Sequence, residues 1–236
     1  MINKIIHGYE FLEFKDENFY GYFSTGKNNL NFNKNTDDGI KNLEKLKEWF
    51  NLKNIGYLNQ IHSDIVHVYD GKICDGDAII TDRKNIGIGV FTADCVPVLV
   101  YDKNRKVIAA IHSGWKGTKK CIVGKTIDKM ILKYNTKVED LRVYIGPHNM
   151  ECCYEVSEDL IRDFKKQQIY RDTNISHGRN LSLQKCIIKQ LINRGVILRN
   201  ITKLDICTYC NQAYSLYSYR RDKECNKRMF SFIFMK

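Results

Sequence analysis

Hydrophobic positions along the chain follow first a helical and then a strand-like period. Over residues 36–50, apolar residues recur at three- and four-residue steps behind Thr36 and two aspartates, which predicts a helix with one buried face. Short apolar runs bounded by turn-prone Asp-Gly pairs follow and predict strands. These runs cover residues 55–58, 65–69, 77–81 and 86–91.

The stretch TADCVPVLVYDKNRKVIAAIHSGWKG, residues 92–117, carries the clearest local pattern. A polar turn at 102–105 separates apolar runs at 96–101 and 106–111, which predicts an antiparallel hairpin. Cys95 directly precedes the first run, and His112 directly follows the second. Because a hairpin returns the chain to the end where it began, we expect both side chains to face one pocket.

The second half of the chain continues the mixture of helices and strands. The pattern predicts a helix from Gly117 to Tyr134, a strand over 141–145 and a terminal strand over 230–235. Two further helices are expected over 157–167 and 182–194, the latter closed by Gly195. Without an internal repeat or linker, the pattern indicates one α/β domain over residues 1–236 with mixed strand directions.

Composition narrows the class of protein. With 236 residues, 43% of them hydrophobic, the chain can bury a sizeable core. It contains neither an apolar run of about 18 residues nor a secretory leader pattern, so we expect a cytoplasmic protein without a membrane partner. The net charge of +11 is spread along the chain, which favours anionic ligands such as phosphate over nucleic acid.

The nine cysteines are an odd number and are scattered, so they are expected to be reduced. Any functional cysteine is then a metal ligand or a nucleophile. Cys207 and Cys210 have CxxC spacing, but no second CxxC follows, and we interpret the pair as incidental. The adjacent Cys152 and Cys153 are interpreted as structural.

His62, Cys95 and His112 form the main candidate site. His62 lies in a polar break between two expected strands. Two imidazoles and one thiolate would make a zinc site with its fourth position open to water or substrate. The alternative is that each histidine is an ordinary hydrogen-bonded residue. His67 follows His62 by five residues and would face the other side of a strand, which makes it a poor fourth ligand.

Several motifs occur together and in order along the chain. Because of these motifs, the chain resembles the YfiH/YlmD family, also called laccase-domain or polyphenol oxidase proteins. The resemblance extends from about Asn29 to the C-terminus. The motifs are QIH at 60–62, TADCVPVL at 92–99, IHSGWKG at 111–117, IGP at 145–147, YEV at 154–156, CT at 207–208 and SYRRD at 218–222.

The resemblance implies a metal site of His62, Cys95 and His112, usually occupied by zinc. It implies phosphorolysis of adenosine, inosine and methylthioadenosine, and deamination of adenosine, beside an older label of copper-dependent phenol oxidation. The implied fold is a mixed-sheet, layered α/β (α+β) sandwich with flanking helices, similar to the cytotoxic necrotizing factor toxins. Substrate-binding positions carried over from the family are Asn31, Gln60, Lys116 and Arg220.

The two reactions would use the site differently. Deamination would need water activated by the metal, with Asp94 as the group that moves protons. Phosphorolysis would need phosphate beneath C1′ of the ribose, held by Lys116, Arg220 and the backbone N–H groups of residues 114–117. Departures from the family pattern at Lys116, Leu43 and Lys223 bear on substrate preference.

Three rival interpretations remain open. A four-copper oxidase needs about ten histidines, and this chain has six, so oxidase activity would come from copper in the zinc site. A metal-independent hydrolase or amidase would use Cys95 as nucleophile and His112 as base. A nucleic-acid-binding protein would need a basic arm or stacking platform, and neither is evident. The expected partners are a purine nucleoside and phosphate, and the expected assembly is a monomer or homodimer.

Overall fold

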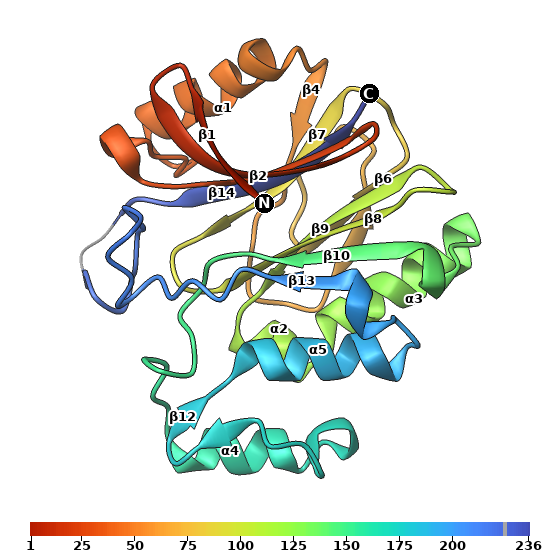
Figure 1. The fold of residues 1–236 in the computed structure, drawn as a ribbon, viewed down its shortest axis with the longest axis vertical. Coiled ribbons are helices and arrows are strands. Elements are labelled where there is room, and N and C mark those ends of the chain that lie inside the picture. The colour runs from red at the N-terminus through yellow and green to blue at the C-terminus, as the bar shows by residue number, and fades with distance from the viewer. Residues whose placement is uncertain (224–225) are drawn as a thin grey trace.

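Two six-stranded sheets lie face to face at the centre of the computed structural model, which describes residues 1–223 and 226–236 (Figure 1). The first sheet has the order β1 (Ile2–Ile6), β2 (Tyr9–Asp16), β3 (Phe19–Ser24), β14 (Met229–Met235), β7 (Ile86–Thr92) and β4 (Asn54–Gly56). The second has the order β13 (Ile201–Lys203), β10 (Leu141–Ile145), β8 (Val96–Asp102), β9 (Val107–Ser113), β6 (Ala78–Thr81) and β5 (Val66–Val68). Both sheets contain parallel and antiparallel pairs, as the sequence predicted.

Helices cover the outer face of each sheet. The helix α1 (Asp37–Phe50) packs on the first sheet, while α3 (Ile122–Tyr134) and α5 (Leu183–Asn193) pack on the second (Figure 1). Short α2 (Trp115–Lys119) precedes α3, and α4 (Glu158–Lys165) lies beyond α5, next to the small hairpin of β11 (Ser176–His177) and β12 (Asn180–Leu181). The result is the mixed, layered sandwich that the resemblance implied.

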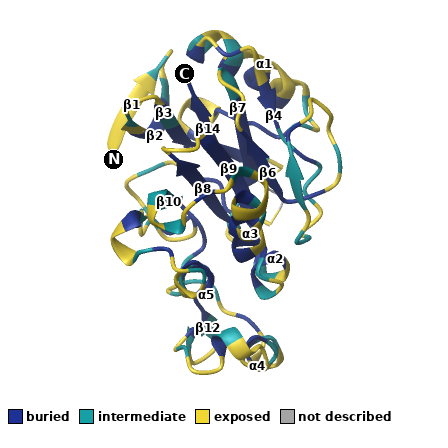
Figure 2. Cartoon of the chain, turned by 90° about the vertical axis from the view of Figure 1, so that its right-hand side faces the viewer, coloured by how far each residue is buried: buried dark blue, intermediate teal, exposed yellow. Residues whose placement is uncertain are grey.

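The predicted hairpin of β8 and β9 is confirmed and forms the middle of the second sheet. Alternate residues face opposite layers, as the two-residue period of a strand requires. Leu99 and Ile108 lie in the core between the sheets, whereas Val98 and Ile111 lie in the core beneath the helices. Every residue of both strands is buried (Figure 2), so this hairpin is a rigid platform for what lies at its ends.

Several predicted elements differ from the structure at their ends. The helix expected from Gly117 to Tyr134 is two helices, because Cys121 takes a left-handed φ of 62° between α2 and α3. Helix α4 is shorter than predicted. The N-cap of α1 is confirmed, since the Thr36 side chain accepts a hydrogen bond from the Gly39 N–H at 3.2 Å. Strands β1 to β3 were not among the predicted elements.

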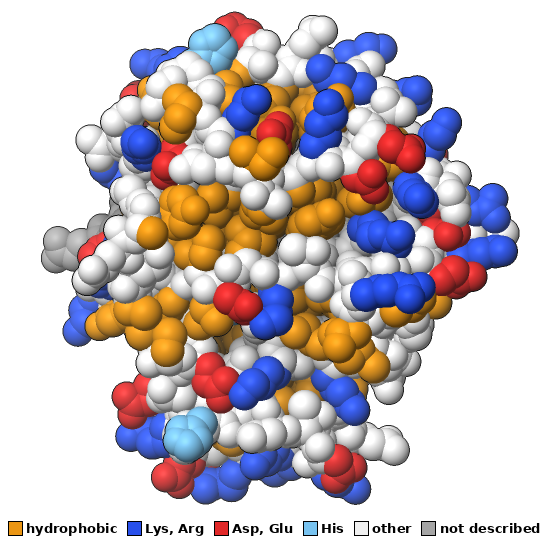
Figure 3. Space-filling view, viewed as in Figure 1, with side chains coloured by type: hydrophobic (Ala, Val, Ile, Leu, Met, Phe, Trp, Pro, Cys, Tyr) orange, Lys and Arg blue, Asp and Glu red, His pale blue; other side chains and the backbone are white. Residues whose placement is uncertain are grey.

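The distribution of charged side chains on the surface agrees with the dispersed charge expected from the sequence. On the face shown in Figure 3, Lys and Arg side chains are interspersed with Asp and Glu, and no continuous basic stripe crosses this face. Among the described residues, no helix has the length and apolar character needed to cross a bilayer.

Candidate metal centre and substrate cavity

Two loops and the end of a strand bring His62, Cys95 and His112 together at one end of the sheets. His62 lies between β4 and β5, Cys95 lies in the turn between β7 and β8, and His112 is the penultimate residue of β9. One ligand atom from each lies within 4.8 Å of the other two, and Cys95 Sγ is 3.8 Å from His62 Nε2. The hairpin register pairs His112 with Pro97, two residues after Cys95, which explains why the hairpin brings the two side chains close.

Asp77, which the sequence analysis did not single out, organises two of these three residues. Its carboxylate is fully buried and lies 2.7 Å from His112 Nδ1. The same carboxylate accepts backbone N–H groups from Ile61, His62 and Ser63 at 3.3, 3.1 and 2.6 Å. These bonds hold His62 at a left-handed φ of 57°, which a histidine adopts only when its surroundings impose it. Asp77 follows an Asp-Gly pair, so its position in the sequence resembled an ordinary turn.

The electrostatics of the cluster favour a thiolate and a charged imidazole. Burial raises the pKa of Cys95, but the charge of His112 and hydrogen bonds from both histidines outweigh it and lower the pKa to about 6. Burial lowers the pKa of His112, but the Cys95 thiolate and Asp77 raise it to about 9. Hydrogen bonds from His112 and Ser63 outweigh the effect of burial at Asp77 and lower the pKa of that carboxyl group.

Gly114 lets the backbone pass close to the cluster. A Cβ atom at this position would lie 3.0 Å from Cys95 Sγ and 3.0 Å from His62 Cδ2. The φ of −73° and ψ of 172° at Gly114 are open to any residue, so the constraint is space and not backbone conformation. The glycine at the start of α2 therefore leaves room for the cluster.

The cluster opens into a cavity of about 500 Å³, which is within the usual range for a small-molecule site. His62, Cys95, Asp94 and His112 lie in its wall. The remaining wall combines aromatic rings with cationic groups. The aromatic residues are Phe91, Tyr154 and Tyr219, and the cationic residues are Lys34, Arg220 and Arg228.

Gln60 and Asn31 hold parts of this wall in place. Gln60 lines the cavity, and its amide bonds the backbone N–H and carbonyl of Phe91 at 2.7 and 2.8 Å. Asn31 does not line the cavity. Its Oδ1 accepts the backbone N–H groups of Asn33 and Arg228 at 2.9 and 3.0 Å, and both of these residues do line it.

Asp94 and Arg220 are joined at the rim. The Asp94 carboxylate accepts hydrogen bonds from the Thr208 hydroxyl at 2.6 Å and from the Arg220 N–H at 2.7 Å. The Arg220 guanidinium lies 4.8 Å from the centre of the Tyr154 ring and donates to the Glu155 carbonyl. Arg220 thus has a fixed place at the cavity wall.

Lys116 is the predicted substrate residue that the structure places elsewhere. It lies in a separate surface depression with Trp115, Lys119 and Lys120, and its Nζ is 5.6 Å from the Trp115 ring centre. The reason is that α2 begins at Trp115 and leaves Lys116 exposed on its outer side. The structure therefore does not place Lys116 in the wall of the cavity that holds the cluster.

The donor set fits zinc and does not fit a multi-copper centre. Two imidazoles and a thiolate from three segments leave one coordination position toward the cavity, as in catalytic zinc sites. The contact from His112 Nδ1 to Asp77 leaves Nε2 for a metal, and a carboxylate behind a ligating histidine is the usual supporting partner. Within residues 1–223 and 226–236, no other histidine joins a group of three or more candidate ligands.

Comparisons with known proteins show the family to which the chain belongs. The family model described as "Multi-copper polyphenol oxidoreductase laccase" matches residues 20–236. A purine nucleoside phosphorylase of Clostridium acetobutylicum is 52% identical over 235 residues, 99% of each chain. A purine nucleoside phosphorylase of Borreliella burgdorferi is 32% identical and covers 73% of this chain and 76% of its own.

Solved structures share the fold. YfiH of Bacillus licheniformis has a TM-score of 0.83 at 26% identity and covers 92% of this chain and 93% of its own. YlmD of Geobacillus stearothermophilus has a TM-score of 0.82 at 22% identity, and the alignment covers 93% of each chain. At this identity the likeness shows only that the two proteins share a fold. With a family model over most of its length and a relative aligned from end to end, the chain belongs to the laccase-like YfiH/YlmD family.

Proposed function

We propose that this protein is a metal-dependent purine nucleoside phosphorylase that acts on adenosine, inosine and methylthioadenosine. One observation carries the proposal: the His62, Cys95 and His112 cluster opens into a cavity whose wall holds both aromatic rings and guanidinium groups. A nucleoside needs a surface on which its base can stack, and phosphate needs cations. The names of the relatives support the same reaction.

The aromatic wall suits a purine base. Tyr154 and Tyr219 line a cavity of about 500 Å³ beside the largely buried Phe91, and flat rings bind a purine by offset stacking. Tyr219 is 60% exposed and would lose this exposure when a base covers it. Tyr154 is held under Arg220, so its ring is already oriented.

The cationic wall suits phosphate. Guanidinium groups bind phosphate through two parallel hydrogen bonds, and Arg220 and Arg228 both line the cavity. The carboxylate of Asp94 holds the backbone of Arg220, and we therefore assign Asp94 a positioning role in place of the proton transfer first expected of it. Lys34 adds a third positive charge to this wall.

His62, Cys95 and His112 would hold the metal, with zinc as the expected ion and copper as its competitor. A bound zinc ion supplies a Lewis acid that draws negative charge from a group at its fourth position. Asp77 orients His112 and fixes the loop that carries His62. The deep placement of Asp77 keeps water away from these supporting hydrogen bonds.

A second candidate is a thiol hydrolase without metal. The observation that favours it is the chain of contacts from Cys95 to His112 and on to Asp77, with a Cys95 pKa of about 6. This arrangement matches a nucleophile, a base and an orienting carboxylate. It uses the same residues as the metal site, so only one of the two can operate at a time.

Product analysis tests the proposal. Zinc-loaded protein is incubated with adenosine, with and without phosphate, and a His112→Ala variant serves as the matched control. Phosphate-dependent formation of adenine and ribose 1-phosphate, lost in the variant, is the expected result. Inosine would indicate deamination instead, and the absence of all three products would refute a purine nucleoside reaction.

The same preparations separate the metal enzyme from the thiol enzyme. Chelation should abolish phosphorolysis, and zinc should restore it. If metal-free protein is active and loses activity when Cys95 alone is alkylated, the thiol mechanism is correct.

A further inference from the structure

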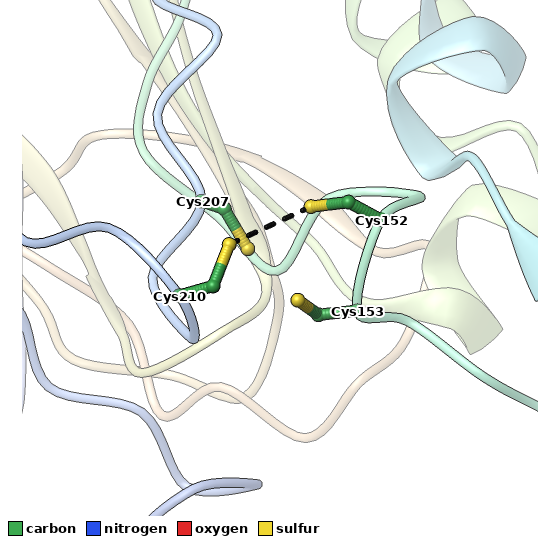
Figure 4. A group of neighbouring side chains, drawn as sticks. All are labelled: Cys152, Cys153, Cys207 and Cys210. Atoms are coloured by element: carbon green, nitrogen blue, oxygen red, sulfur yellow. Dashed lines mark hydrogen bonds between the residues drawn. The ribbon is translucent and has the colours of Figure 1, made fainter.

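Four cysteines outside the cavity converge from two loops. Cys152 and Cys153 follow β10, and Cys207 and Cys210 follow β13. All four sulfur atoms lie within 4.8 Å of one another, and Cys152 Sγ is 3.8 Å from Cys210 Sγ. Figure 4 shows the sulfur atoms directed toward a common centre. The CxxC pair, which the sequence analysis interpreted as incidental, thus lies against an adjacent cysteine pair far upstream.

The spacing of the sulfur atoms matches metal coordination. Four thiolates held about 2.3 Å from a zinc ion in a tetrahedron lie about 3.8 Å from one another. A disulfide would bring two sulfurs to about 2.05 Å, and these four cysteines are free. Tetrahedral sulfur sites select zinc or iron, and a site with four protein ligands has no position left for a substrate.

We propose that Cys152, Cys153, Cys207 and Cys210 bind a second zinc ion in a closed, structural tetrathiolate site. This site is separate from the His62, Cys95 and His112 cluster, and it does not depend on which reaction the cavity performs. The CxxC spacing of Cys207 and Cys210 is the usual spacing for two zinc ligands on one turn.

The surroundings offset the negative charge that four thiolates would carry. Cys207 is buried, and the backbone N–H groups of Met150, Tyr209 and Cys210 lie near its sulfur. The Arg221 guanidinium donates to the carbonyls of Thr208 and Tyr209 at 3.0 and 3.3 Å. These two residues separate Cys207 from Cys210, so the guanidinium, which also pairs with Asp222, fixes the turn that carries both cysteines. Such outer contacts stabilise thiolate ligands.

The two cysteine loops also contact the cavity wall. The Asn149 N–H donates to the Asp94 carbonyl at 2.9 Å, and the Thr208 hydroxyl donates to the Asp94 carboxylate at 2.6 Å. Tyr154, one residue after Cys153, forms part of the cavity wall. An ion that joins the two cysteine loops would therefore hold Asp94 and Tyr154 in register beside Cys95.

Metal counting on purified, zinc-replete protein tests the proposal. Wild type should carry about two equivalents of zinc per chain, and the Cys152→Ser/Cys210→Ser variant about one. The His62→Ala/His112→Ala variant should also retain about one equivalent, and the control Cys74→Ser, which lies outside both clusters, should retain both. Two equivalents in the double-serine variant, or none in the double-alanine variant, would overturn the proposal.

X-ray absorption on the His62→Ala/His112→Ala protein provides a test that needs no cysteine substitution. The zinc edge should show a shell of four sulfur atoms at about 2.3 Å without nitrogen. A mixed nitrogen and oxygen shell would overturn the proposal, as would iron in place of zinc. A count of two fewer thiols in the unfolded, unreduced protein would show that a disulfide occupies the site instead.

Discussion

One buried carboxylate, Asp77, supports both ends of the metal cluster. It orients His112 through Nδ1, and it accepts three consecutive backbone N–H groups of the loop that carries His62. Neither task requires Asp77 to touch substrate. Its loss should therefore be felt first in the geometry of the metal ligands.

The variant Asp77→Asn should weaken zinc binding by about 10- to 100-fold, which is the usual cost of removing a carboxylate behind a ligating histidine. Competition with a chelator of known affinity measures this loss. Asp64→Asn is the matched control. Asp64 lies in the loop that carries His62, but its carboxylate pairs with Lys120 and Lys125. Equal zinc affinity in the Asp77 variant and wild type would contradict the account.

Cys95 should behave as a low-pKa thiol in metal-free protein. The charge of His112, against the opposing effect of burial, lowers the pKa of Cys95 to about 6, and the thiolate is the reactive form. The rate of Cys95 alkylation by iodoacetamide should therefore rise with pH, reach half its plateau near pH 6 and stay level toward pH 8. Peptide-resolved mass spectrometry measures the rate. A midpoint near that of an ordinary thiol would exclude the predicted charge pair.

Gly114→Ala tests the space left for the ligands. The new Cβ would press on Cys95 Sγ and His62 Cδ2, both 3.0 Å away, while the backbone conformation accepts alanine. We expect weaker zinc binding with only a small change in the melting temperature. Calorimetric titration with zinc, beside a thermal scan, checks both statements. Unchanged zinc affinity would show that the site has more room than the geometry gives it.

At the scale of elements, the start of α1 connects helix stability to the cavity. Thr36 caps the helix through Gly39, and its hydroxyl donates to the Asn33 carbonyl at 2.8 Å. Asn33 lines the cavity. The cap therefore fixes both the helix and a segment of the wall.

Thr36→Ala should cost about 1 kcal/mol of unfolding free energy, as expected for a lost N-cap. It should also raise the KM for nucleoside, because Asn33 loses the hydrogen bond from the Thr36 hydroxyl. Ser157→Ala removes the corresponding cap of α4, away from the cavity, and should lower stability by a similar amount without changing KM. Denaturant melts and steady-state kinetics on both variants measure the effects, and an equal KM in the two would count against the link.

The sequence was most informative where a local pattern determines the element. The β8 and β9 hairpin and the cap at Thr36 follow from periodicity and turn chemistry, so Cys95 and His112 could be placed together in advance. Asp77 could not be found this way, because its partners are set by the packing of β6 against β9. The two cysteine pairs are visible in the sequence, but their meeting depends on a contact between loops 58 residues apart, which no local pattern predicts.

At the scale of the whole molecule, the layers explain where the chemistry lies. The buried β8 and β9 hairpin supports Cys95 at one of its ends and carries His112 within β9, and the loops of neighbouring strands add His62 and Asp77 to that edge. The chain has a net charge of +11, and the cavity wall carries cationic side chains. Both features favour an anionic co-substrate. Fold, charge and ligand geometry thus lead to the same cavity.

Anomalous diffraction at the zinc edge from crystals of zinc-loaded protein tests the central claim most directly. The account predicts a peak bonded to nitrogen atoms of His62 and His112 at about 2.0–2.1 Å and to Cys95 Sγ at about 2.3 Å, with one position facing the cavity. Crystals that show no peak among these three residues, with their side chains turned apart, would contradict it.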